Sequence, residues 1–248
     1  MSAPGLDHVG DTELERLQLA DWRRRTVELY SEVRRLAVAP TAAHARWRAT
    51  RESMYRDHAA SPVPPDRRHE FQAIHFPYDS GLRFELPLIR DEFPAAPEHE
   101  SAEHESAEHE SAEHGTPDGP GIGAGHLALK LPVSTGRPLA FERIGWLEIP
   151  FQDGLRRLAL YWLPEYSGGL FLPFRDGTNG RETYGGGRYL LDSGKGADLG
   201  GDPERGTVVV DFNFAYQPSC AFDARWSCPL APPENRLDLD VRAGERIA

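Results

Sequence analysis

The carboxy-terminal half of the sequence is a series of short apolar or alternating runs separated by glycine, proline and aspartate turns. Such runs, with no helical segment between them, are typical of antiparallel β-strands. The Asp153-Gly154 junction predicts a hairpin, because Asp-Gly accepts the positive φ angles of a tight turn. The runs cover residues 126–133, 139–151, 155–163, 169–174, 188–191, 207–214 and 237–241. This half is therefore expected to form an antiparallel β barrel or sandwich.

The amino-terminal residues have a helical pattern instead. Apolar side chains recur at helical spacing over residues 12–39, and a second helix is expected from 41 to about 59, with Trp47 and Met54 on one face. Pro40 is expected to end the first helix. The predicted fold class is thus mainly β (α+β), an antiparallel barrel or sandwich with an amino-terminal helical pair.

Four regions are expected along the chain. The strand predictions within the second region are residues 71–76 and 82–89, the latter with apolar and charged side chains in alternation. The regions are a helical pair (1–60), a linker with the first strands (61–93), a disordered Glu/His repeat insertion (94–125) and the main β domain (126–248).

The repeat suggests a metal site, because His99, His104, His109 and His114 recur every five residues among carboxylates. A spacing of five places successive histidines about 140° apart on a helix, so they do not share one face. Weak binding of a divalent metal stays open, but replication slippage in a tolerant loop is the favoured interpretation.

Charge and hydropathy exclude several function classes. The net charge is −11, and the seven repeat glutamates leave about −4 for the rest, an ordinary value for a soluble domain. The arginines between residues 16 and 56 alternate with carboxylates, as on a solvated helix face. We expect no nucleic-acid partner and no membrane partner, and the lack of a targeting or spanning segment favours the cytoplasm.

Three polar motifs occur in order in the carboxy-terminal half, within residues 174–190, 211–220 and 228–245. They resemble the bacterial and archaeal domain-of-unknown-function family 1684, with a looser likeness around Trp22 and residues 71–79. The resemblance implies no activity, cofactor or catalytic residue. The family usually has asparagine where this chain has Gln217.

The turn at residues 183–188 contains three consecutive glycines, which allow close approach of another group. Arg188 is predicted to clamp an anionic group, with Asp176, Tyr184 and Asp211 completing a polar pocket. The alternative is structural: Arg188 pairs with Asp176 or Asp211 and pins the sheet. The glycine run is not a phosphate loop, since it lacks the lysine and the following helix.

Asp176 and Asp211 are the catalytic candidates, as a paired acid and base. Asp211 and Asn213 are expected on the same face of one strand. The candidate ligand-binding residues are Arg175, Thr183, Tyr184, Arg188, Asn213, Tyr216 and Asn235.

Cys220 and Cys228 are the only cysteines of the sequence. A zinc site would need the distant His75 or His126, and a disulfide would close the intervening loop. In a cytoplasmic protein, two reduced and partly buried thiols are favoured.

The sequence leaves three functional hypotheses. The first is a binding module for a small polar or anionic ligand near the turn. The second is a hydrolase that uses a carboxylate base with Arg188 as charge stabiliser. In the third, the polar residues form a buried structural network. The sequence does not identify a cofactor or a substrate, and it does not predict the oligomeric state.

Overall fold

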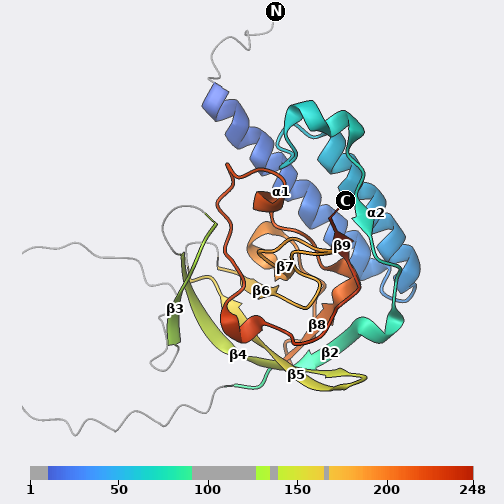
Figure 1. Cartoon of the computed structure of the whole chain (residues 1–248), viewed down its shortest axis with the longest axis vertical. Helices are drawn as coiled ribbons and strands as arrows, with labels where there is room; N and C mark the ends of the chain where they lie inside the picture. The colour runs from blue at the N-terminus through green and yellow to red at the C-terminus, as the bar shows by residue number, and fades with distance from the viewer. Residues whose placement is uncertain (1–10, 91–126, 135–138, 165–167, 248) are drawn as a thin grey trace, which may run out of the picture.

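The computed structural model describes residues 11–90, 127–134, 139–164 and 168–247 (Figure 1). Two helices precede the strands: α1 (Asp11–Arg35) and α2 (Pro40–Asp57). The strands are β1 (Ile74–His75), β2 (Arg83–Pro87), β3 (Leu127–Leu131), β4 (Leu139–Phe151), β5 (Gly154–Trp162), β6 (Leu170–Phe174), β7 (Arg188–Asp192), β8 (Thr207–Asp211) and β9 (Glu245–Arg246). Short 3-10 helices are η1 (Pro65–Glu70), η2 (Ser80–Leu82), η3 (Ser193–Lys195), η4 (Phe212–Phe214), η5 (Ser219–Ala221) and η6 (Pro233–Asn235).

The main sheet has five antiparallel strands in the order β3-β4-β5-β6-β7 and curls into a half-barrel. Two further antiparallel pairs, β2 with β8 and β1 with β9, complete the strands of the described residues. The predicted hairpin is confirmed, since Phe151 pairs with Gly154 where β4 turns into β5. The mainly β fold class with amino-terminal helices is therefore confirmed.

A bulge in β4 between Arg143 and Gly145 divides the apolar side chains between two cores. Beyond the bulge, Leu147 and Ile149 face the main core inside the curled sheet, whereas Phe141 belongs to a second cluster. A Cβ at residue 145 would collide with the Ile89 carbonyl, so glycine permits the backbone approach that links this strand to the segment after β2. The bulge therefore helps the sheet to curl.

Helices α1 and α2 lie side by side along one flank of the molecule (Figure 1). Pro40 begins α2 rather than continuing α1, because proline fits the first helical turn, where its missing N–H costs nothing. Tyr30 and Trp47 are fully buried in the apolar cluster that joins the helices to Phe214 of the β region. The helical pair is therefore packed on the β region through this cluster.

Several predicted strands differ from the structure. Only Ile74–His75 of residues 71–76 is a strand, and residues 237–241 are not strand although Leu237 and Val241 are buried in the main core. Residues 207–214 change at Asp211 from strand to 3-10 helix. Asp211 and Asn213 therefore do not share a strand face. The Glu/His repeat and His126 lie outside the described residues.

Candidate functional site

Arg188 and Asp176 form an ion pair inside the protein. Arg188 begins β7 and Asp176 follows β6, and both side chains are completely buried. The guanidinium lies 3.0 Å from Asp176 Oδ2 and also donates to the carbonyl oxygens of Val241, Ala243 and Glu245. Arg188 thereby ties the final extended segment to the sheet.

Both carboxylate oxygens of Asp176 are occupied. Oδ1 accepts a hydrogen bond from Thr178 Oγ1 at 2.7 Å, and Oδ2 accepts one from the backbone N–H of Val241 at 2.8 Å. Thr183 Oγ1 lies 2.9 Å from Thr178 Oγ1, and both threonines are fully buried. Burial lowers the pKa of Arg188, against the opposing effect of Asp176. This geometry favours the structural alternative for the pair over a ligand clamp.

Asp211 and Asn213 belong to a different network. Asn213 Nδ2 donates to Asp211 Oδ1 at 2.8 Å and to the Asp79 carbonyl oxygen, and Asn213 Oδ1 accepts the Asp79 backbone N–H. Asp211 is 1% exposed, and burial raises its pKa to about 6. Asp211 and Asp176 have no hydrogen-bond partner in common among the described residues, so the two catalytic candidates lie in separate environments.

The remaining candidates are dispersed. Asn235 is fully buried and bonds both backbone groups of Ala159 and a carbonyl of β6, so it joins two strands. Arg175 is half-buried beside the same strands. Tyr184 hydrogen bonds to Cys220, whose thiol is free. Of the predicted set, the structure brings together Arg188, Asp176 and Thr183 in one group, Asp211 and Asn213 in a second, and Cys220, Cys228 and Tyr184 in a third.

A second buried ion pair connects the helices to the last strand. Arg51 Nε lies 2.7 Å from Glu245 Oε1, and the two side chains are 8% and 3% exposed. The Arg51 guanidinium also contacts the rings of Trp47, Tyr55 and Tyr216, at 4.7–5.0 Å from their centroids. Burial alone would lower the pKa of Arg51, but the Glu245 carboxylate raises it. Arg51 is thus held charged between a carboxylate and three aromatic faces.

The Glu245 side of this pair borders a surface groove of about 590 Å³. Such a volume is in the range of small-molecule sites. The groove lies between η1 with β1 on one side and the loop that contains η5 on the other. Its lining residues are Tyr55, Arg67, Glu70, Phe71, Gln72, Ala73, Ile74, Gln217, Ala221, Phe222, Glu245, Arg246 and Ile247.

Several polar groups around the groove lack a protein partner among the described residues. Gln217 is 7% exposed, and its Oε1 accepts no hydrogen bond, although its Nε2 donates to the Arg246 carbonyl at 3.2 Å. Arg246 Nε is buried and unpartnered as well. Arg67 and Arg246 form no ion pair with the described residues, although the Arg246 guanidinium lies 5.1 Å from the centre of the Phe76 ring. Groups of this kind are satisfied by a ligand or by water.

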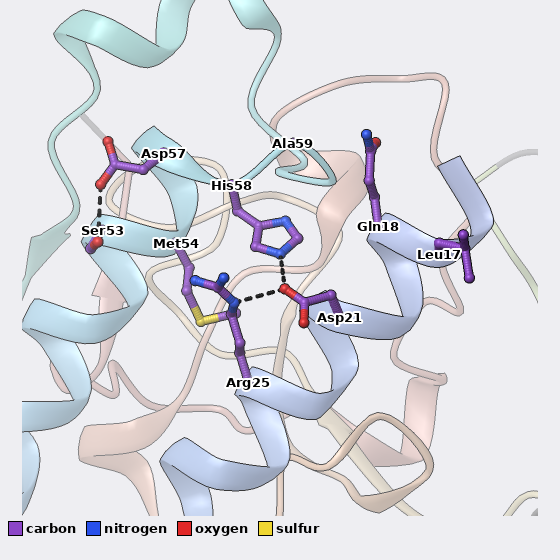
Figure 2. Close-up of a pocket in the computed structure, with 9 residues that line it drawn as sticks. All are labelled: Leu17, Gln18, Asp21, Arg25, Ser53, Met54, Asp57, His58 and Ala59. Atoms are coloured by element: carbon purple, nitrogen blue, oxygen red, sulfur yellow. Dashed lines mark hydrogen bonds and ion pairs between the residues drawn. The ribbon is translucent and has the colours of Figure 1, made fainter. Parts of the chain in front are cut away.

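The cleft between α1 and α2, of about 420 Å³, is different (Figure 2). Asp21 accepts from Arg25 at 2.8 Å and from His58 at 3.1 Å, and Ser53 donates to Asp57 at 3.0 Å (Figure 2). His58 Nδ1 accepts a backbone N–H, so the other nitrogen carries the proton toward Asp21. The polar side chains of the cleft bond one another, and they leave fewer free groups for a ligand.

Sequence reasoning did not find the residues of the groove. Arg51 was assigned to the solvated helix face, yet it follows Trp47 by four positions and therefore lies on the buried stripe of α2. A cation on an apolar stripe is the signal of a buried ion pair. Glu245 lies in the third of the polar motifs, and the sequence predicted no role for it. Arg67 and Arg246 carried no signal, because their position depends on how distant segments meet.

Comparison with known proteins assigns the β region. The family described as "Protein of unknown function (DUF1684)" matches residues 124–246. The carboxy-terminal half of this chain belongs to DUF1684. The DUF1684 region contains the Arg188 and Asp176 pair, Gln217 and Glu245, whereas Arg51 and Arg67 lie in front of it. The groove is therefore built from the family region together with the preceding helical part.

A solved structure has the same fold. The solution NMR structure of an uncharacterized protein from Haloarcula marismortui is 28% identical in sequence, with a TM-score of 0.51, and the match covers 81% of this chain and 90% of that chain. A search of the curated proteins gave no match. Among the helices of the described residues, none combines the length and the apolar character needed to cross a bilayer.

Proposed function

We propose that the groove bordered by Gln217, Glu245 and Arg246 binds a small polar ligand that carries an anionic group. The observation that carries the proposal is a pair of buried polar atoms without a hydrogen-bond partner among the described residues, the Gln217 carbonyl oxygen and Arg246 Nε, beside a cavity that the exposed Arg67 also lines. An anionic group between two arginines would gain charge-assisted hydrogen bonds. The Gln217 oxygen would accept one donor of the ligand.

The apolar part of the groove supports a ligand with a flat or apolar body. The rings of Tyr55, Phe71 and Phe222 contact one another with centroids 5.0–5.7 Å apart. Aromatic side chains supply a large contact area, while few polar groups fix the orientation of a ligand. The class of ligand is therefore a small organic acid with at least one N–H or O–H donor.

The groove adjoins the glycine-rich turn. The backbone N–H of Ile247 in the groove donates to the Glu182 carbonyl at 3.0 Å, immediately before residues 183–188. The ligand would thus lie near the turn, but the turn would position the groove wall rather than supply Arg188 as the anion partner.

The hydrolase alternative has less support. Asp176 and Asp211, its candidate bases, do not line the groove. Glu245 does line it, but both of its oxygens are engaged: Oε1 with Arg51 and Oε2 with the backbone N–H of Gln217 at 2.8 Å. A carboxylate held in this way orients its neighbours and is poorly placed to take a proton.

The test begins with native mass spectrometry of the purified protein, to find a ligand that co-purifies. Malate, which carries a hydroxyl donor beside its carboxylates, and inorganic phosphate are then titrated and followed by NMR chemical-shift changes. Arg246→Gln and Arg67→Gln are each expected to weaken binding about tenfold, since each removes a charge-assisted hydrogen bond. Gln217→Met is expected to impair binding of a ligand that donates to the amide oxygen.

Arg205→Gln is the matched control, because Arg205 is exposed and lies outside the groove. It removes the same charge and should leave affinity unchanged. Equal weakening by Arg205→Gln would show a non-specific charge effect. That result, or no co-purifying molecule together with no saturable binding of either probe, would overturn the proposal.

A further inference from the structure

Two segments of the chain, the loop of residues 220–228 and the glycine-rich turn, meet at the two thiols. Cys220 lies in η5, Cys228 follows eight residues later, and Tyr184 comes from the glycine-rich turn. The backbone N–H of Cys220 donates to Cys228 Sγ at 3.3 Å, and the Tyr184 hydroxyl lies near enough to the Cys220 thiol for each to shift the pKa of the other. Both thiols are free and buried, at 8% and 5% exposure.

The glycines of the turn explain how Tyr184 reaches the thiols. A Cβ at residue 186 would collide with the Tyr184 ring, so glycine allows the ring to fold back over its own turn. Gly187 has φ of 101°, and a Cβ there would lie 2.6 Å from the Phe174 carbonyl oxygen. The glycine run thereby allows Tyr184 to reach its position, and Tyr184 does not line the ligand groove.

We propose that Cys220 and Cys228 are a redox-active dithiol, in which Cys220 reacts with a peroxide and Cys228 resolves the product to an intramolecular disulfide. The hydrogen bond from the Cys220 backbone N–H to Cys228 Sγ, at 3.3 Å, places the second thiol beside the first cysteine, where the resolving step needs it. Cys228 and Ser219, the residue before Cys220, line a cavity of about 60 Å³, which is room for molecules the size of hydrogen peroxide. This inference does not depend on ligand binding in the groove.

The two thiols have unequal roles. The hydrogen bond from the Cys228 thiol lowers the pKa of Cys220 to about 6 against the opposing effect of burial, and the Tyr184 hydroxyl adds to the decrease. The same interaction raises the pKa of Cys228, so Cys228 keeps its proton. The other titratable groups facing the pair are Tyr189 and Lys195. Cys220 is therefore the nucleophile and Cys228 the proton donor.

The reaction balances with hydrogen peroxide as the oxidant. The Cys220 thiolate attacks one peroxide oxygen, an S–O bond forms, the O–O bond breaks, and the leaving hydroxide becomes water by taking a proton from the solvent, which replaces the proton that Cys220 released on ionisation. The Cys228 sulfur then attacks the resulting sulfenic acid, an S–S bond forms, the S–O bond breaks, and the second hydroxide leaves as water with the Cys228 proton. The two thiols lose two electrons, and the peroxide gains them.

Intact mass spectrometry of the reduced protein after peroxide treatment tests the proposal. The expected product is a monomer lighter by about 2 Da, the two hydrogens lost, with a peptide map that links Cys220 to Cys228. Cys228→Ser is expected to accumulate a sulfenic acid that dimedone traps at Cys220. Cys220→Ser should give almost no trapped product.

Tyr184→Phe should slow the reaction of Cys220 with peroxide about threefold at pH 5, because fewer hydrogen bonds stabilise the thiolate. Tyr78→Phe is the matched control, since its hydroxyl bonds no group of the described residues. Three results would overturn the proposal: equal sulfenic acid in the two serine variants, disulfides only between molecules, or thiols that react only after unfolding in urea. The mass of the unmutated protein decides the matter even where a variant fails to fold.

Discussion

Two buried arginines, Arg188 and Arg51, are held in opposite ways. Arg188 is fully enclosed by Asp176 and backbone carbonyls, and burial lowers its pKa. Arg51 lies between Glu245 and three aromatic rings, and its pKa is raised. The first arginine was expected to form the site and belongs to the core, whereas the second was expected to face solvent and borders the groove.

The difference shows where a buried charge can serve function. The pair of Arg188 and Asp176 has no open side, so it can only stabilise the junction of β6, β7 and the final segment. Glu245 has one side against Arg51 and another against the groove. An ion pair at the border of a cavity can respond to a ligand, because part of its surroundings is replaceable.

The largest effect is expected from Asp176→Asn. The substitution keeps the size of the side chain but leaves the Arg188 charge buried without a carboxylate, which should cost about 4 kcal/mol of unfolding free energy. Urea unfolding at pH 7 measures the change. Asp240→Asn is the control, because Asp240 bonds the exposed Arg181 and Arg242, and a loss of well under about 1 kcal/mol is expected there. Similar losses in both variants would contradict the enclosed character of the Arg188 pair.

Glu245→Gln makes the same change in the second pair and should cost about 2 kcal/mol. The loss is smaller because Arg51 retains its aromatic contacts, and the groove admits water to the carboxylate side. Urea unfolding is again the measurement, and the double variant with Arg51→Met gives the coupling between the two side chains. A loss as large as that of Asp176→Asn would show that the two pairs are equally enclosed.

Asp211 extends the comparison to a buried carboxylate with a looser and more exposed cation, since Arg83 Nε lies 3.9 Å from Asp211 Oδ2 and the Arg83 side chain is 34% exposed. Its pKa in the folded protein is about 6, above the value near 4 of an unfolded aspartate, so the folded state binds more protons between these values. The stabilisation is complete below about pH 4 and is lost as the pH rises through about 6.

Asp211→Asn should remove this dependence. Between pH 5 and pH 7, the unfolding free energy of the unmutated protein is expected to decrease by about 1 kcal/mol relative to the variant. Urea unfolding at both pH values, on both proteins, measures the difference. Parallel pH profiles would mean that Asp211 is ionised in the fold at pH 5.

The pattern of the sequence was sufficient for the strands that bury one face. The β4–β5 hairpin follows from alternating apolar residues and from Asp153-Gly154, both of which act locally. The strand prediction for residues 237–241 was wrong because the apolar spacing of buried Leu237 and Val241 is also that of a strand. Their backbone N–H groups instead donate to the Arg175 carbonyl and the Asp176 carboxylate. Burial alone produces an alternating apolar pattern, and a buried segment need not be hydrogen bonded to a neighbouring strand.

The site was harder to predict than the fold. Arg188 and Asp176 are 12 residues apart, and their pairing was one stated alternative. Arg51 and Glu245 are separated by 194 residues, and their contact depends on the docking of the helices. A local pattern carries no information on such a contact, apart from the position of Arg51 on the apolar stripe of α2.

Residues 241–246 supply the partners of both arginines: backbone carbonyls for Arg188 and a carboxylate for Arg51. Ribosomes make these residues after every helix and every other strand described above. A chain that has both helices and a formed sheet but not these residues therefore still lacks the Glu245 carboxylate for Arg51 and the backbone carbonyls that complete the Arg188 and Asp176 pair. The ionic contact between the helices and β9 accordingly forms later in synthesis than the apolar contact of the helices with Phe214.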